Sequence, residues 1–387
     1  MEGKMKSKNI FNSIVAAFFT IIFSVLGGCE STPKTGRGTS ITAGQLAREI
    51  NTINRNSATV NGDTVTLLAD KCLEIKKTLV VPEGVILDVT AKDARLLLHG
   101  GTLIVDGTIN AGANQIAHDW NNAGYGIISG SGIIRLMNKG YLFLIGSDRD
   151  GDTYTLTLDG VTLDGLTRDS TDNDKENNDK PLIQIEKGGE FIMKSGLITG
   201  NTNSPVSYAD GGGMQVKEGG TFIMEGGSIS GNAAYGGGQS GSGGGGIRID
   251  KGTFIMKGGT ISNNKAGNVG GGVLVMGNGI IGSFTMLGGT ISGNTVTEKN
   301  AEGGGGVCVG INDGGGIFTM VGGTIYGSSA QGGNANTAPS GAALMVSSRA
   351  ESTKWGTDGI YTKGGVNQIG GSNIGATNDT LIAVPEQ

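Results

Sequence analysis

An eleven-residue phrase that recurs five times in the second half of the chain limits what the chain can fold into. It begins at Phe191, Phe222, Phe254, Phe284 and Phe318, and it reads FIMKSGLITGN, FIMEGGSISGN, FIMKGGTISNN, FTMLGGTISGN and FTMVGGTIYGS. Successive phenylalanines are 31, 32, 30 and 34 residues apart. A repeat of this length is typical of solenoids, propellers and arrays. Glycine breaks each apolar run, and Phe-x-Met alternates with period two, so the phrase predicts short strands rather than helices.

A second short apolar run precedes each phrase and follows a glycine cluster or a polar segment. These runs are LIQI at 182–185, MQV at 214–216, IRI at 247–249, VLV at 273–275 and VCV at 307–309. Three short strands in roughly 31 residues predict one coil of a single-stranded right-handed parallel β-helix, an all-β solenoid. Propeller blades are the alternative, but they usually run about 40–50 residues with a repeated aromatic signature, and Trp120 and Trp355 do not repeat.

The register of the phrase predicts which side chains face the interior. Phe191, Met193 and Ile198 are expected to point inward, and their equivalents stack about 4.8 Å apart. The small Ser-Gly or Gly-Gly pair between Met and Ile predicts a sharp corner, because a Cβ atom obstructs such a turn.

An asparagine closes four of the phrases. These residues are Asn201, Asn232, Asn264 and Asn294. Because they recur at one corner of successive coils, we expect them to form a ladder of side-chain amides along the stack.

Looser alternating runs before the repeats predict further coils. They lie at 64–70, 78–89, 94–111 and 154–165. Before them, Leu46, Ile50 and Ile53 share one face of a predicted helix, 43–53, which we expect to cap the open end of the stack. We therefore assign the parallel β-helix to 43–346, with its clearest repeats at 182–328, and a final coil and cap to 347–387.

The first 28 residues have the composition of a signal peptide. Lys4, Lys6 and Lys8 form a basic start, and Ile14 to Leu26 is a mostly apolar run of 13 residues. That run suits a signal peptide and is shorter than the ~20 residues of a transmembrane helix. It ends in Leu26-Gly27-Gly28-Cys29, which resembles the lipobox of bacterial lipoproteins.

This resemblance implies that Cys29 receives a diacylglycerol and becomes the new N-terminus. The alternative is an ordinary signal peptide followed by a chance cysteine. The polar residues that come next predict a flexible tether over 29–42.

The repeats themselves resemble the glycine-rich, polymorphic-membrane-protein-like β-helix repeats of bacterial surface proteins. The likeness rests on GG-[AVI]-x-[VI] and F-x-[MN] phrases, matched by Gly271 to Val275 and by Phe284-Thr285-Met286. It covers 182–328. The resemblance implies an envelope-exposed protein, often an adhesin, and is more specific for fold than for function.

An enzyme is the alternative from a different class, because β-helices also carry pectin-degrading enzymes. Hydrolases of that kind use paired carboxylates beside Gly-His-Gly, whereas His99 lies in LHG and His118 in AHDW. Lyases use a basic side chain near calcium carboxylates. Arg248 and Asp250 match by residue type only, and alternation predicts that Arg248 points to solvent.

Metal and cofactor motifs are weak. The acidic segment 148–152 departs from the EF-hand template, and 168–180 reads as a solvated loop in which calcium is a minor alternative. We therefore expect no cofactor and no metal site. Neither glycine cluster, 243–246 or 303–306, is followed by Gly-Lys-Ser/Thr, so turns are favoured over phosphate loops.

Cys72 and Cys308 lie in alternating runs and are predicted to be inert buried thiols. About eight coils separate them, which is too far for a disulfide.

An apolar stripe is the candidate partner site. Alternation places the second and fourth positions of the phrase on the outer face, which makes a stripe of Ile192, Ile223, Ile255, Leu287 and Val321. Beside it, Lys194, Glu225 and Lys257 alternate in sign. An apolar stripe bordered by charge favours partner binding. The alternatives are that a corner loop at 200–211 or 232–243 covers the stripe, or that β-branched residues merely suit strands.

Together these features predict a lipid-anchored protein of the cell envelope, at the outer membrane or cell surface, with an adhesin-like or structural role and no catalysis. The expected partners are the membrane, through the lipid, and a glycan or a protein of a host or neighbouring surface. The net charge of −5 argues against nucleic acid. A polysaccharide lyase or hydrolase is the alternative.

Overall fold

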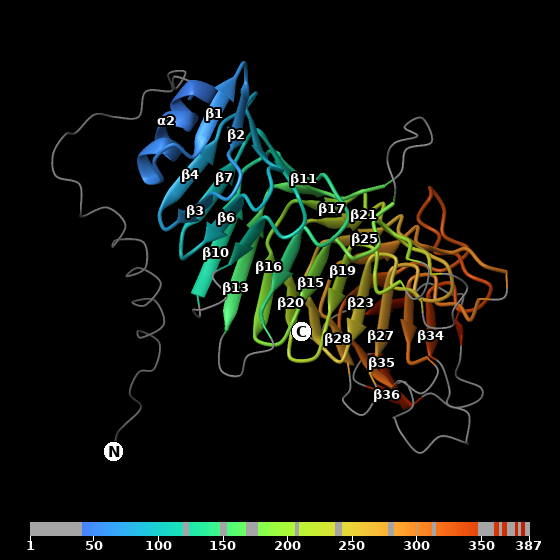
Figure 1. Ribbon diagram of the computed structural model, residues 1–387. Coiled ribbons are helices and arrows are strands. Elements are labelled where there is room, and N and C mark those ends of the chain that lie inside the picture. The colour runs from blue at the N-terminus through green and yellow to red at the C-terminus, as the bar shows by residue number, and fades with distance from the viewer. Residues whose placement is uncertain are drawn as a thin grey trace, which may run out of the picture. The chain divides into compact units, whose positions relative to one another are not determined.

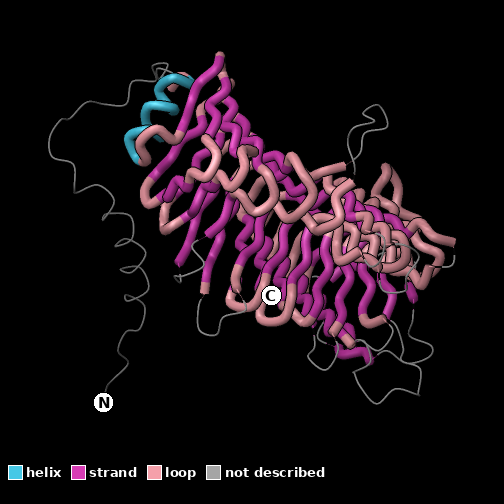
Figure 2. Tube along the Cα trace, in the orientation of Figure 1, coloured by secondary structure: helices cyan, strands magenta, loops and turns pink. Residues whose placement is uncertain are grey.

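The structure, a computed structural model, describes residues 41–118, 124–147, 153–167, 177–205, 209–236, 242–277, 282–299, 301–311, 315–346, 360–363, 366–369, 376–377 and 381–383. In these ranges Ala43–Ile53 form helix α2, and the other elements are β-strands (Figures 1 and 2). The prediction of an all-β fold with a short N-terminal helix is therefore confirmed.

The described strands pair into five sheets. Sheet 1 contains β1 (Ala58–Asn61), β2 (Thr64–Leu67), β5 (Ile86–Val89), β8 (Thr108–Ala111), β11 (Ile133–Leu136), β14 (Thr162–Asp164), β17 (Leu197–Thr199), β21 (Ser228–Ser230), β25 (Thr260–Ser262), β29 (Thr290–Ser292), β33 (Gly323–Ile325) and β38 (Leu381–Ala383). Sheet 2 contains β4 (Thr78–Val81), β7 (Thr102–Val105), β10 (Gly124–Ser129), β13 (Tyr154–Asp159), β16 (Gly189–Met193), β20 (Thr221–Met224), β24 (Thr253–Met256), β28 (Gly282–Met286), β32 (Gly316–Met320), β35 (Ile360–Lys363) and β36 (Val366–Ile369).

The three smaller sheets complete the repeats. Sheet 3 contains β12 (Phe143–Ile145), β15 (Ile183–Ile185), β19 (Met214–Val216), β23 (Ile247–Asp250), β27 (Val273–Met276), β31 (Val307–Val309), β34 (Leu344–Val346) and β37 (Ala376–Thr377). Sheet 4 contains β18 (Thr202–Asn203), β22 (Ala233–Ala234), β26 (Lys265–Ala266) and β30 (Thr295–Val296). Sheet 5 contains β3 (Cys72–Ile75), β6 (Arg95–Leu98) and β9 (Ile116–His118).

The central repeats, from β15 to β30, visit four sheets in the same order, whereas the first repeats pass through sheet 5, sheet 2 and sheet 1. After β19 in sheet 3, the chain passes through β20 in sheet 2, β21 in sheet 1 and β22 in sheet 4, and then returns to sheet 3 as β23. These strands pair in parallel with the equivalent strands of neighbouring repeats. In the described ranges, antiparallel pairs occur only where the stack begins and ends. The ribbon colour accordingly changes in chain order along the stack (Figure 1).

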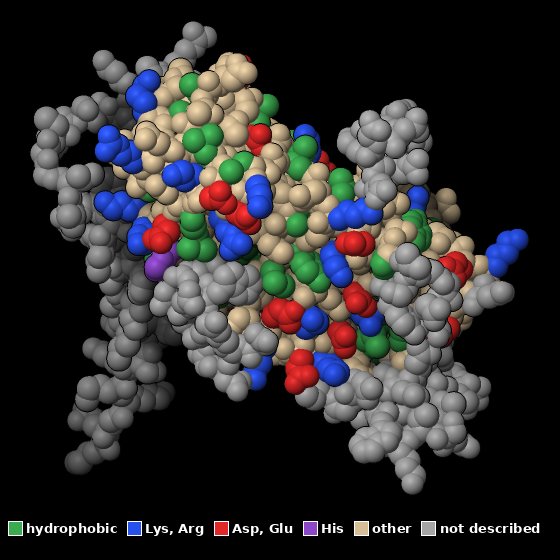
Figure 3. Space-filling view, viewed as in Figure 1, with side chains coloured by type: hydrophobic (Ala, Val, Ile, Leu, Met, Phe, Trp, Pro, Cys, Tyr) green, Lys and Arg blue, Asp and Glu red, His purple; other side chains and the backbone are tan. Residues whose placement is uncertain are grey.

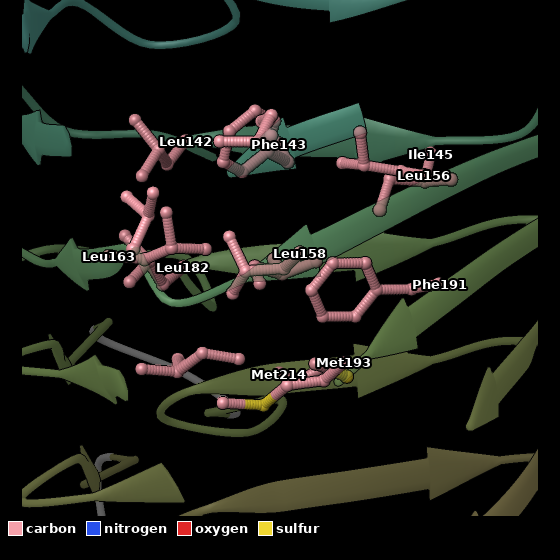
Figure 4. Packing of buried hydrophobic residues seen from close by; sticks show 14 of the residues in the cluster. Leu142, Phe143, Ile145, Leu156, Leu158, Leu163, Leu182, Phe191, Met193 and Met214 are labelled. Atoms are coloured by element: carbon pink, nitrogen blue, oxygen red, sulfur yellow. The ribbon is translucent and has the colours of Figure 1, made fainter. Parts of the chain in front are cut away.

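The core consists of columns of identical side chains. Phe191, Phe222, Phe254, Phe284 and Phe318 are buried, and consecutive rings stack with centroids 4.5 to 5.5 Å apart. The inward methionines and isoleucines of the phrase are also buried, so the predicted inward register is confirmed. Figure 4 shows Phe191 and Met193 packed in the interior with Leu158 and Met214.

Glycine is required at the corner between sheets 2 and 1. Gly259 has φ of +86°, a backbone conformation that side chains with a Cβ rarely adopt. A Cβ atom placed there lies 2.6 Å from Met224 Cε and 2.7 Å from the Gly227 carbonyl oxygen. The glycine therefore permits both the turn and the packing of the preceding repeat's methionine beneath it.

Helix α2 packs on β1, β2 and β3 at the start of the stack. Thr42 and Gln45 form a capping box, in which the Thr42 hydroxyl accepts from the Gln45 backbone and the Gln45 side chain accepts from the Thr42 backbone. The buried face consists of Ala43, Leu46, Ala47 and Ile50. The expectation that Ile53 joins this buried face is wrong: Ile53 is the last residue of the helix and is 50% exposed.

Replacing Ile261 with alanine is expected to lower the free energy of unfolding by about 2–4 kcal/mol. Ile261 is fully buried between Ile229 and Ile291 of the neighbouring repeats, so the shorter side chain leaves a cavity. Urea unfolding measures the change, and the outward neighbour Thr260→Ala is the control. Equal shifts in the unfolding midpoint for both variants contradict the register.

Candidate functional site

The apolar stripe lies on the outer face of sheet 2. Ile192, Ile223 and Ile255 pair directly on adjacent strands β16, β20 and β24, and each is partly exposed. Leu287 is 41% exposed, and Val321 is partly buried. The structure thus brings the three isoleucines into one row and places Leu287 and Val321 in the adjacent row, where both directly follow their strands.

That adjacent row is charged in its first half. Asp159 is the last residue of β13, and its equivalents Lys194, Glu225 and Lys257 directly follow β16, β20 and β24; all four are exposed. The Lys257 ammonium donates to Glu225 over 3.0 Å, and both side chains keep at least 40% of their surface exposed. Such an exposed pair contributes little to stability, about 0–1 kcal/mol. Because both side chains remain exposed, their charges are accessible to a partner.

The corner loops lie over a different sheet. Isolated parallel β-bridges join Asp210 to Gly243, Gly243 to Val269 and Val269 to Gly303. The loop backbone lies close to sheet 3, because a Cβ atom placed on Gly244 is 2.9 Å from Arg248 Cα. The described parts of these loops therefore cover the outer face of sheet 3. The alternative that they fold over the stripe is not supported in those parts.

Arg248 differs from its prediction. It points away from the core as expected, but the covering loops leave it only 7% exposed, and its guanidinium lies 3.2 Å from the Asp210 carboxylate. The same outward row contains buried Gln184 and Gln215 before it and buried Leu274 after it. The prediction of a solvated arginine is wrong because the outer face of sheet 3 is not solvent-facing.

The two cysteines of the described region differ from each other. Cys308 is fully buried, and its burial, helped by nearby Glu302, raises the pKa of its thiol well above the usual range. Cys72 is exposed, so the prediction of a buried thiol there is wrong. Its strand buries Leu73 and Ile75, and Cys72 shares the outer face with Glu74.

Alkylation is expected to modify Cys72 rapidly in the native protein and to leave Cys308 unmodified until the chain unfolds. The thiolate is the reactive form, and burial both shields the Cys308 thiol and disfavours its ionisation by raising its pKa. Peptide mass spectrometry after alkylation with and without denaturant measures both sites. Equal labelling of the two under native conditions contradicts the placement of Cys308.

The asparagines form a continuous buried ladder. The Oδ1 atom of Asn264 accepts from the backbone N–H and the Nδ2 of Asn232, at 3.0 and 3.2 Å. Asn264 in turn donates from both groups to Asn294 Oδ1, each at 3.0 Å. Asn201 donates from its backbone to Asn232 Oδ1 at 3.2 Å. Because these amides are buried and satisfied by one another, they hold the stack together and offer no ligand site.

The ladder is longer than the four asparagines of the repeated phrase. Asn178 donates to Asn201 Oδ1, and Asn336 Oδ1 accepts from Asn294. Asn336 follows an insertion that displaces it from the phrase. The sequence feature that identifies Asn336 is the threonine after it, since Asn336-Thr337 repeats Asn294-Thr295. The structure places these two pairs at equivalent positions, because a parallel β-bridge joins Thr295 to Thr337.

Several predicted features lie outside the described residues. These are Cys29, the signal peptide 1–28, the tether except for residues 41 and 42, the segment 148–152, residues 168–176 of the second acidic segment and most of the predicted cap at 347–387. Within the described ranges, no three acidic, histidine or cysteine side chains are grouped so as to hold a metal ion. No helix there is long and apolar enough to cross a membrane.

On the face drawn in Figure 3, acidic and basic side chains are interspersed, and small clusters of hydrophobic side chains lie between them. Such a surface does not by itself indicate a ligand class. Comparison with protein-family models, with curated proteins and with solved structures finds no match for this chain.

Proposed function

We propose that the chain is a non-catalytic, adhesin-like protein, anchored at the cell surface by a lipid on Cys29 and folded as a right-handed parallel β-helix. In this role the apolar stripe is the binding face. The repeated route of the chain through parallel sheets supports the β-helix, and the Leu26-Gly27-Gly28-Cys29 sequence supports the anchor.

The observation that carries the binding role is the partly exposed row of Ile192, Ile223 and Ile255. Three β-branched apolar side chains lie on consecutive strands beside alternating charges, while the described loops cover another sheet. An apolar row bordered by charge is the pattern of a recognition surface, in which burial provides affinity and charge provides orientation.

The surroundings of Arg248 favour binding over catalysis. This arginine is the basic side chain that the sequence suggested for a lyase, and it is held against Asp210 beneath the glycine-rich loops. A general base needs access to a substrate proton, which burial under backbone does not offer.

The double variant Ile223→Lys with Ile255→Lys is expected to lose partner binding while its circular dichroism stays unchanged. Two ammonium groups on the row have to be desolvated at any apolar interface. The matched control is Ser228→Lys with Thr260→Lys, which adds the same charges to the same two repeats on the outer face of sheet 1.

Binding is measured with the full chain against an array of acidic and neutral glycans and against immobilised matrix proteins. The same glycans are tested for depolymerisation with and without calcium. Binding that survives in the folded stripe variant contradicts the site, and depolymerisation by the parent chain contradicts the non-catalytic role.

A further inference from the structure

The charged row on sheet 2 alternates in sign over four consecutive repeats. Asp159, Lys194, Glu225 and Lys257 read negative, positive, negative, positive along the stack, one per strand at roughly 4.8 Å. Reversing this order gives positive, negative, positive, negative. The row is therefore complementary to its own antiparallel copy, as a two-fold interface requires.

Two copies can be related by a two-fold axis that lies in the interface, parallel to the strands and midway between β16 and β20. This axis brings the oppositely charged residues of the two rows together. It places Lys194 opposite the partner's Glu225 and Asp159 opposite the partner's Lys257, and symmetry makes each contact twice. The axis falls near the middle of sheet 2, whose order runs from β36 through β20 and β16 to β4.

The neighbouring rows fit the same axis. Ile192 comes to lie opposite the partner's Ile223, so the apolar stripe packs on itself. Glu190, the acidic residue on the other side of the stripe, meets the partner's Thr221, and no like charges face each other among these positions. If the two stacks instead run in the same direction, the charged row of one copy faces the row of Glu190 and Thr221 of the other. In that arrangement no basic side chain lies opposite Glu225.

The face is large enough for a stable pair. About ten overlapping strands at ~4.8 Å, each about 15 Å long, give about 700 Å² per copy. That is close to the roughly 800 Å² that each partner buries in a standard protein interface.

We propose that the outer face of sheet 2 binds a second copy of this chain in antiparallel orientation, with Lys194 and Glu225 at the centre of the interface. This inference rests on the proposed binding role of the apolar stripe and names its partner. In such a pair the two α2 helices, each at the start of its own stack, lie toward opposite ends of the interface. Two lipid-anchored copies then bridge two facing membranes, a homophilic form of adhesion.

The test is sedimentation velocity of the full chain in mild detergent, with two charge-reversal variants. The parent chain is expected to dimerise. Lys194→Glu and Glu225→Lys each set like charges against each other twice and are expected to raise the dimer dissociation constant at least about 100-fold. An equimolar mixture of the two variants is expected to dimerise again. In the mixed pair the new glutamate of one variant meets the new lysine of the other, and the unchanged Glu225 of the first meets the unchanged Lys194 of the second.

Lys265→Glu is the matched control, since it reverses one exposed charge on sheet 4 and is expected to dimerise like the parent. Thermal unfolding of each variant verifies that the fold persists. A monomeric parent chain overturns the inference, and so does a mixture of the two variants that stays monomeric. If the parent is monomeric while the stripe variant loses binding to a glycan or matrix protein, the inference fails and the proposed function stands.

Discussion

Replacing Asn264 with alanine is expected to lower the free energy of unfolding by about 3–5 kcal/mol. The Asn264 side chain is fully buried and joins three repeats: it accepts from Asn232, donates to Asn294 and donates to the Ile229 carbonyl oxygen at 2.9 Å. Alanine leaves the backbone N–H of Asn232 and the carbonyl of Ile229 buried without these bonds. Each such orphaned group costs about 1–3 kcal/mol.

Urea unfolding at equilibrium measures this loss, and two further variants make it specific. Asn264→Asp keeps the shape but has no N–H to donate, so we expect it to be similarly damaging. Asn263→Gly is the control, because Asn263 is exposed with φ of +55° and glycine suits that backbone. If Asn264→Ala unfolds at the same midpoint as the control, the ladder does not stabilise the stack.

Changing Cys29 to alanine is expected to abolish incorporation of labelled fatty acid and to release the chain from the membrane fraction or leave its signal peptide uncleaved. Lipid transfer requires a thiol, and a single acyl chain contributes about 0.8 kcal/mol for each buried CH₂, so its loss removes the anchor. Metabolic labelling followed by fractionation measures both effects. Cys72→Ala is the control, since it removes an exposed thiol from strand β3, far along the sequence from the lipobox.

Equal labelling of the Cys29 variant and the parent contradicts the lipid anchor. A variant that is unlabelled but still in the membrane fraction instead identifies an uncleaved signal peptide as the retaining element.

The repeated phrase made most of the core predictable from the sequence. Each Phe-x-Met pair occupies the same register in five repeats, so one assignment of inward positions applies to Phe191 and to Phe318 alike. The small pair that follows predicts the corner, because few residues other than glycine adopt the φ seen at Gly259. Period-two alternation and glycine placement are local properties, and local properties can be read from a single sequence.

The surroundings of outward side chains could not be predicted in this way. Alternation assigns Arg248 to the outside, but its burial depends on glycine-rich loops of other repeats that pack over sheet 3. In a short run, alternation alone also does not decide which of the two sets of residues points inward, and a cysteine is compatible with either face of a strand. At Cys72 the charge of Glu74, two residues later, is the signal that fixes the phase.

The candidate site shows the same division. The sequence predicts that Ile192, Ile223 and Ile255 point outward and form one row, and the structure confirms it, because they pair directly on adjacent strands. The self-complementarity of the charged row needs the inter-strand register and the position of β16 and β20 within sheet 2. Those relations join residues some thirty positions apart and follow from packing.

The most direct test of a surface-anchored repeat stack compares two adjacent residues of β26 on intact cells. In a Cys72→Ser background, Lys265→Cys and Ala266→Cys are treated with a membrane-impermeant maleimide. Labelling is measured on the peptide that contains residues 265 and 266, because the buried Cys308 also becomes reactive on denaturation. Lys265 is exposed on sheet 4 and Ala266 is fully buried. We expect Lys265→Cys to be labelled on intact cells and Ala266→Cys to be labelled only after denaturation. Labelling of Lys265→Cys only after lysis contradicts surface anchoring, and equal labelling of both on intact cells contradicts the stacked register.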